Sequence, residues 1–351
     1  MKIRRITLAV LLILTLLFAA DVKYFSGLRS IGGRQPAIEI EKSKEEGVTA
    51  GRTREFTHSK QEITKLKVQN QGGEIIVEQA AGDEISVAVE IKAVGADLEE
   101  AVRKMARWSV DESRRGDLVS YRVRGEAPAK GEREVEAAFL IKVPAGLEIT
   151  LEQGFGEVTV TGVAADLKLD VRHSTAEIAG LEGMLTIASG FSAVNLKDIS
   201  SRVVIDDSHS AYDISGLLGG LELTSSFSTF ALRDIADSLA VKDSHSTVEV
   251  FGFAGGIDAV TSFSTLLLHE ISGPVVIEDS HSKIKLGLLE TAGGYNFDLD
   301  LEHGTLTGSI PPFLEVVKED NETWAQGRLG PGDTEIRLRT KFGDLKLDLI
   351  E

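Results

Sequence analysis

Residues 208–228 read SHSAYDISGLLGGLELTSSFS, and this stretch carries the pattern that decides the fold. It opens on Ser208-His209-Ser210 and closes on Ser226-Phe227-Ser228, so the two rings are eighteen residues apart. A ring recurs at this spacing along the chain, and the ring positions are Phe155, His173, Phe191, His209, Phe227, His245, Phe263 and His281. Phe and His alternate, which makes the full sequence period 36 residues. A strict period of this size indicates a solenoid or another repeat array.

Apolar residues alternate with polar ones on both sides of each ring position. Leu221 and Leu223 precede Phe227 by six and four residues. Phe230 follows Phe227 by three residues, so the parity of the apolar positions changes across the ring. Alternation with a period of two is typical of β-strands, and the change of parity means that one strand ends and another begins. A glycine-rich turn such as Gly219-Gly220 closes the unit, because glycine tolerates a positive φ.

Each unit is therefore strand, corner, strand and turn, and it cannot fold alone. About five inward apolar side chains, worth roughly 1.5–3 kcal/mol each, face an ordering cost of roughly 1–2 kcal/mol per residue. Stacking the units supplies the missing hydrogen bonds and closes the core. We predict an all-β protein, a parallel β-solenoid of about 18-residue repeats with one short helix in its N-terminal part. The alternation leaves open a coil of 18 or of 36 residues, and the apolar positions shared by both half-repeats favour 18.

The N-terminal residues predict export. Lys2, Arg4 and Arg5 precede an apolar run over residues 6–20, and we interpret residues 1–29 as a signal peptide or signal anchor. The positive-inside rule then places the rest of the chain outside the cytoplasm, in the periplasm or at the cell surface. The run at 6–20 either anchors the chain to the cytoplasmic membrane or is removed by cleavage. Residues 30–55, with Gly, Pro, Lys and Glu, are interpreted as a flexible linker.

The remaining chain divides into three segments. Residues 56–150 are predicted as an N-terminal strand-rich part of the solenoid, with a helix at 96–108 that could cap the stack. Leu98, Val102 and Met105 lie on one face of that helix. Residues 151–290 hold the regular repeats, and residues 291–351 are predicted as C-terminal solenoid rungs and a cap.

Composition narrows the functional classes. The chain has 38 Lys and Arg against 55 Asp and Glu, a formal net charge of −17, and such a surface repels nucleic acid and anionic lipid. It has no cysteine, which excludes disulfides, thiol catalysis and cysteine-ligated metals. We predict no nucleic-acid partner and no cofactor.

The repeats resemble a known family. The step Ile141-Lys142-Val143-Pro144-Ala145-Gly146, followed by corners such as Gly156-Glu157-Val158 and Gly343-Asp344-Leu345, is similar to the layout of the bacterial adhesin family of the DUF4097 type. The resemblance covers about residues 56–351. It implies a right-handed β-helix-like fold and a surface-interaction role, and it provides no catalytic residues. The chain departs from the family in using Ser-His-Ser and Ser-Phe-Ser at most corners, where glycine is more usual.

Three corners contain Asp, Ser and His together, which raises the question of chemistry. A catalytic triad is not expected, because consecutive strand residues point to opposite sides and the imidazole could not bridge its neighbours. A metal column is an alternative, and its candidate ligands are His209, His245, His281, Asp207, Asp243 and Asp279. The favoured interpretation is that each ring fills a corner of the core, stacked on the ring above it, with its nitrogens bonded to the adjacent serine or aspartate.

We therefore predict a non-catalytic extracytoplasmic solenoid that presents a rigid, adhesin-like surface to a protein or polysaccharide of the cell envelope. The metal-binding solenoid is the second hypothesis. A glycan-processing β-helix enzyme is the third; it is disfavoured because carboxylates are dispersed, and because Trp108 and Trp324 lie outside the repeats.

Overall fold

The structure is a computed structural model that describes residues 38–42, 47–125 and 135–350. The predicted signal segment lies outside these residues. Within them, no helix is long and apolar enough to cross a membrane.

Thirty strands and one helix make up the described chain. The N-terminal elements are β1 (Ile38–Lys42), β2 (Val48–Ser59), β3 (Lys65–Asn70), β4 (Gly73–Gln79), β5 (Glu84–Gly95), α2 (Leu98–Ala106), β6 (Ser109–Arg115), β7 (Leu118–Arg124) and β8 (Val135–Val143). The regular repeats form β9 (Glu148–Gln153), β10 (Gly156–Thr161), β11 (Asp166–Arg172), β12 (Ser174–Ala179), β13 (Leu185–Gly190), β14 (Ala193–Ile199), β15 (Val203–Ser208), β16 (Ala211–Leu217), β17 (Leu221–Ser226), β18 (Thr229–Ile235), β19 (Leu239–Ser244), β20 (Thr247–Phe251), β21 (Ile257–Ser262), β22 (Thr265–Ile271), β23 (Val275–Ser280) and β24 (Lys283–Leu289). The C-terminal elements are β25 (Tyr295–Glu302), β26 (Leu306–Gly308), β27 (Leu314–Glu319), β28 (Glu322–Leu329), β29 (Thr334–Lys341) and β30 (Asp344–Ile350).

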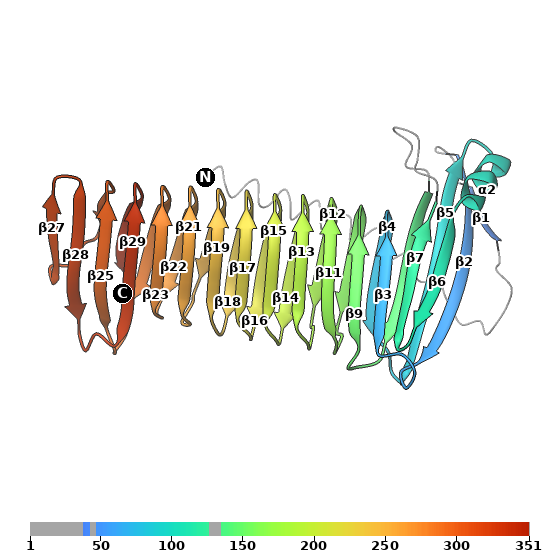
Figure 1. Cartoon of the computed structure of the whole chain (residues 1–351), viewed down its shortest axis with the longest axis horizontal. Helices are drawn as coiled ribbons and strands as arrows, with labels where there is room; N and C mark the ends of the chain where they lie inside the picture. Colours follow the sequence, from blue (N-terminus) through green and yellow to red (C-terminus); the bar gives the residue numbers. More distant parts are fainter. Residues whose placement is uncertain (1–37, 43–46, 126–134, 351) are drawn as a thin grey trace. The chain divides into compact units, whose positions relative to one another are not determined.

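The strands form two sheets of fifteen strands each, and the prediction of a parallel β-solenoid is confirmed. Each regular coil gives one strand to each sheet, and Figure 1 shows successive coils side by side from β9 onward. Strand pairing joins each residue to the one eighteen positions later, as in Leu221 with Leu239 and Phe230 with Val248. The coil therefore has 18 residues, the smaller of the two predicted sizes.

The interior is filled by the alternating apolar residues that the sequence pattern indicated. Leu223 on β17 and Leu232 on β18 are both buried, and so are their equivalents in the other coils. Stacked rings also occur inside, where the ring centroids of Tyr212 and Phe230 lie 4.8 Å apart. One continuous core thus runs between the two sheets.

The coils at both ends are out of chain order. β3 lies between β7 and β9, and β4 lies between β8 and β10. At the other end, β29 lies between β23 and β25, and β30 lies between β24 and β26. Antiparallel strands follow outside these coils: β5 pairs with β8 and β2 with β5 at one end, and β28 pairs with β25 at the other. They cover edges that a parallel stack would leave open.

Two predictions for the N-terminal part need correction. The predicted linker at 30–55 contains β1 and the beginning of β2, which pair with each other in antiparallel fashion. The predicted helix exists, but it spans Leu98–Ala106 and buries Ala101 and Met105, while Leu98 is exposed. It packs on β5 and β2. Asp97 begins the helix by accepting a hydrogen bond from the Glu100 N–H at 2.8 Å.

Candidate functional site

The corner rings form one continuous stack, which we call the ring ladder. Neighbouring ring centroids lie 4.5–5.2 Å apart, and neighbouring planes are within 24° of parallel. Its members in spatial order are Phe155, His173, Phe191, His209, Phe227, His245, Phe263, His281, Phe342 and His303. All eight predicted ring positions belong to it.

The last two rungs lie in the predicted C-terminal rungs at 291–351, outside the eight regular ring positions. His303 precedes Phe342 in the chain, yet Phe342 stacks between His281 and His303. This order follows from the insertion of β29 and β30 between neighbouring coils. It preserves the alternation of Phe and His through the last rung. The sequence could have indicated this order, because continued alternation requires a Phe between His281 and His303.

The ladder lies on the outside of the solenoid, so the prediction that the rings fill the core is wrong. Phe155 is 44% exposed, and the phenylalanines at 191, 227 and 263 are 54–58% exposed. All five ladder histidines are exposed as well. From His173 to His281 the residue two before each ring is buried or half-buried and the serine one after it is buried, which leaves the ring itself outward. Because the rings are stacked, their faces are covered and their edges meet solvent.

The backbone at the ladder is strained. Nine ladder residues, from His173 onward, have φ between +49° and +65°, the left-handed region that favours glycine. A non-glycine residue there costs roughly 1–2 kcal/mol. Aromatic stacking returns about 0.5–1.5 kcal/mol per pair beyond the area it buries. Stacking therefore offsets much of the strain, and the chain keeps a bulky ring where glycine would be easier to accommodate.

A polar column supports the ladder from inside. Buried serines follow the seven rings from His173 to His281, and the Ser228 N–H donates to the Ser246 hydroxyl of the next coil at 3.0 Å. The Asp243 carboxylate accepts hydrogen bonds from Ser225 and, at 2.7 Å, from Ser264. These bonds satisfy polar groups that would otherwise be costly to bury.

The inward aspartates alternate with hydroxyl residues in this column. Asp207, Asp243 and Asp279 are separated by Ser225 and Thr261. Two neighbouring carboxylates are thus two rungs apart, about 9.6 Å at the usual strand spacing of ~4.8 Å. This spacing relieves the repulsion expected of an unbroken aspartate column.

The predicted His/Asp metal columns do not form, because the histidines and the aspartates point to opposite sides of the wall. The imidazoles of His209, His245 and His281 point outward, whereas Asp207, Asp243 and Asp279 bond to inward hydroxyls. Phe separates each imidazole from the next, so two of them are also about 9.6 Å apart and cannot share one ion. Within the part of the chain that the structure describes, no group of three or more His, Asp or Glu could hold a metal ion. The same opposition of sides excludes a Ser-His-Asp relay at these corners.

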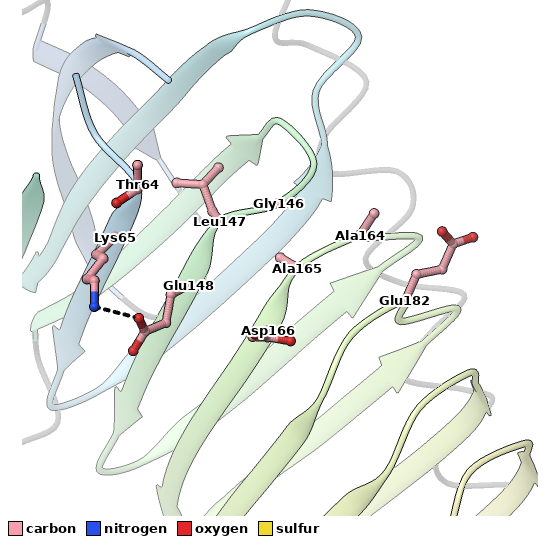
Figure 2. A pocket seen from close by; sticks show the side chains of 9 residues that line it. All are labelled: Thr64, Lys65, Gly146, Leu147, Glu148, Ala164, Ala165, Asp166 and Glu182. Atoms are coloured by element: carbon pink, nitrogen blue, oxygen red, sulfur yellow. Dashed lines mark ion pairs between the residues drawn. The ribbon is translucent and has the colours of Figure 1, made fainter. Parts of the chain in front are cut away.

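A shallow hollow of about 330 Å³ lies away from the ladder, and Figure 2 shows the side chains that line it. It contains three exposed carboxylates, Glu148, Asp166 and Glu182. Glu148 is directed toward Lys65, with which it forms an ion pair at 2.8 Å, and Glu182 is directed away from both. The hydrogen bond to Glu148 raises the pKa of Lys65. A glycosidase acid needs a desolvated carboxyl group opposite a second one, and this exposed trio lacks that arrangement.

Comparisons with known proteins give distant likenesses of fold. No family model matches the chain, and no curated protein matches it. A solved structure named a "putative lipid binding protein" from Parabacteroides distasonis is 9% identical, with a TM-score of 0.38, 86% of this chain covered and 97% of the other. A "putative adhesin" from Bacteroides fragilis is 12% identical, with a TM-score of 0.33 and coverages of 85% and 97%. A "putative cell adhesion protein" from Clostridium sporogenes is 6% identical, with a TM-score of 0.23 and coverages of 86% and 100%.

Proposed function

We propose that this chain is a non-catalytic, adhesin-like binding protein that acts outside the cytoplasm and uses the ring ladder to hold a partner in the cell envelope. The observation that carries the proposal is the ladder itself, ten stacked rings on the outer surface, nine of them at strained corners. Strained positions persist where the surrounding structure holds them, and they cluster at functional sites.

The surface properties of the ladder support binding. Soluble proteins rarely expose long continuous apolar patches without a function. Here the phenylalanines of five coils form one row with the imidazoles between them. The stacked sheets hold every rung at a constant spacing, so a partner meets a rigid, periodic surface and little conformational entropy is lost from the protein on binding. The partner that suits such a row is extended, as a polysaccharide or a surface protein segment would be.

Export and the absence of catalysis are parts of the same proposal. Export is proposed from the basic start and the apolar run at residues 6–20. A binding role is favoured over an enzymatic one because the hollow in Figure 2 and the ladder both lack a desolvated acid, base or nucleophile arranged for chemistry.

The test is a pair of matched triple variants of the full chain in mild detergent. Phe191→Asn/Phe227→Asn/Phe263→Asn removes three ladder rings, and asparagine tolerates the left-handed backbone. Met184→Asn/Leu218→Asn/Ile310→Asn removes three exposed apolar side chains away from the ladder. We expect the ladder variant to cosediment with washed envelope fragments of the source bacterium at least fivefold less than the unmodified chain, and the control variant to bind as the unmodified chain does.

Two results would overturn the proposal. Equal binding by both triple variants would mean that the ladder is not the binding surface. Release of soluble products from the envelope fragments by the purified chain would mean that the protein is an enzyme. Circular dichroism at matched concentrations confirms that both variants keep the strand content of the unmodified chain.

A further inference from the structure

The ladder contains five of the seven histidines of the chain, and each of the first four is stacked between two phenylalanines. Histidine is the type of side chain whose charge ordinarily changes between about pH 5 and 8, a range that cells and their surroundings reach. An aromatic face attracts a cation. The alternation thus gives each of the first four imidazoles two phenyl faces as neighbours, and it gives His303 one.

The alternation also allows all five imidazoles to be charged together. Neighbouring imidazoles are two rungs apart, about 9.6 Å at the usual strand spacing. This separation exceeds the Debye length of about 8 Å at physiological ionic strength, so their mutual repulsion is largely screened. A histidine on every rung would halve the separation and would make full protonation unfavourable.

The charged side chains nearest the ladder are three bases and three acids, so their net charge is zero. They occupy the position just before each ring or two after it, and they are Arg172, Lys283, Lys341, Glu157, Glu302 and Asp344. Glu302 is paired with Lys341 at 2.9 Å and lies 3.8 Å from His303. From rung 191 to rung 263 these flanking positions hold only Gly, Ala, Ser and Thr. Protonation of the imidazoles therefore converts a locally neutral ridge into a row of positive charges.

The next outward positions on the two sheets carry mostly acids. On the strands before the corners they are Glu152, Asp170, Asp206, Glu278 and Asp300, with Lys242 and Arg339. On the strands after the corners they are Glu177, Asp213 and Glu249, with Lys285 and Lys346. Several of these acids have cationic partners, among them Asp213 with Arg233 at 2.8 Å. Together with the net charge of −17 they repel an anion while the imidazoles are neutral.

Hydroxyl groups border the ladder on both sides. Ser208, Ser226, Ser244, Ser262 and Ser280 precede the rings, and Thr229, Thr247 and Thr265 follow them by two residues. Within residues 135–350, none of these side-chain hydroxyls donates or accepts a hydrogen bond. They are available to the hydroxyl groups of a sugar chain. Nucleic-acid bases would need free ring faces for stacking, and the ladder covers all but its terminal faces.

From these features we propose that the ring ladder binds a linear acidic polysaccharide in a pH-dependent way, tightly when its five imidazoles are protonated and weakly when they are neutral. The inference depends on the proposed function in one respect, that the ladder is the binding surface. The polymer lies along the ladder, its anionic groups meet the imidazolium edges, and its hydroxyls bond to the Ser and Thr rows.

The experiment measures binding of the full chain to dextran sulfate, whose sulfates stay ionised, and to neutral dextran, at pH 5.5 and 7.5. We expect dextran sulfate to bind at least tenfold more tightly at pH 5.5, with the gain lost at high salt, and neutral dextran to bind at neither pH. His245→Asn is expected to weaken binding at pH 5.5 about threefold. His269→Asn removes a histidine outside the ladder with the same change in charge, and it is expected to leave the affinity unchanged.

Three outcomes would overturn the inference. They are equal affinity at the two pH values, equal losses in His245→Asn and His269→Asn, and binding of a single-stranded oligonucleotide of matched charge as tightly as dextran sulfate. Each of these leaves the envelope-binding assay of the phenylalanine variants untouched, so failure here is distinguishable from failure of the proposed function.

Discussion

Every regular coil has two corners that require a positive φ, and the chain occupies them differently. At one corner φ is +54° to +67° and the residues are Gly162, Gly180, Asp198, Gly216, Asp234, Gly252 and Glu270, which we call the glycine corner. At the other corner φ is +49° to +65°, and from His173 onward the residue is always Phe or His. The backbone requirement is the same at both. Glycine would satisfy the backbone equally well at the ladder corner, so the backbone alone does not account for the rings there.

The largest effect should come from the polar column beneath the ladder, which has no counterpart beneath the glycine corner. Asp243→Ala leaves the Ser225 and Ser264 hydroxyls without their buried acceptor. We expect the free energy of unfolding to fall by about 2–4 kcal/mol, measured by denaturant titration. Asp237→Ala, at an exposed turn, is the control and should change it by less than about 0.5 kcal/mol. Equal small losses in both variants would show that the column contributes nothing to the ladder corner.

A substitution at the glycine corner can introduce the backbone strain of the ladder corner without its ring stacking. At Gly252 φ is +62° and a Cβ would meet no atom within 4 Å, so Gly252→Ala adds backbone strain without a clash. We expect a loss of about 1–2 kcal/mol. At Gly82 a Cβ also has open space and φ lies outside the left-handed range, so Gly82→Ala should change stability by about 0.5 kcal/mol or less. Thermal melts of the two variants would contradict the strain argument if their midpoints coincided.

The smallest effects compare the removal of a side chain from each corner. Asp234→Gly should raise the free energy of unfolding by about 0.5 kcal/mol, because relief of strain slightly exceeds the entropy cost of glycine. Phe227→Gly gains the same relief but loses stacking with His209 and His245, so a net loss of about 1 kcal/mol is expected. Denaturant titrations that show a gain in unfolding free energy for Asp234→Gly and a loss for Phe227→Gly would confirm the difference between the two corners. A gain in both variants would mean that stacking contributes little.

The regular coils could be predicted from the sequence because each strand repeats its own apolar positions. Leu221, Leu223 and Phe230 have equivalents eighteen residues on, and this alone indicates coil size and strand order. The direction of the rings could not be read in the same way. Alternation assigns a side only within a strand, and the left-handed corner between Asp207 and Ser210 lets both of these point inward with His209 between them pointing out.

The ends of the stack were less predictable for a different reason. The place of β29 depends on which strands pair in three dimensions, and local pattern does not contain that information. The same holds for β1 and β2, where the composition of residues 30–55 indicated a linker although Val48–Ser59 forms a long strand along β5. The metal hypothesis was wrong for the same reason as the predicted direction of the rings. Both assumed that the His and the Asp two residues before it lie on one side of the strand.

The out-of-order coil at the C-terminal end has a consequence for how the protein is made. Among the described strands β25 pairs with β28 and β29, so it cannot join the growing stack until residues 334–341 have been synthesised. Closing β23 onto β29 spans 61 residues rather than 18, which adds roughly 1 kcal/mol of loop-closure entropy. β29 therefore joins β23 and β25, two strands that precede it in the chain, and Phe342 after it completes the ladder between His281 and His303. A chain that stops short of it would hold its final histidine on an undocked hairpin.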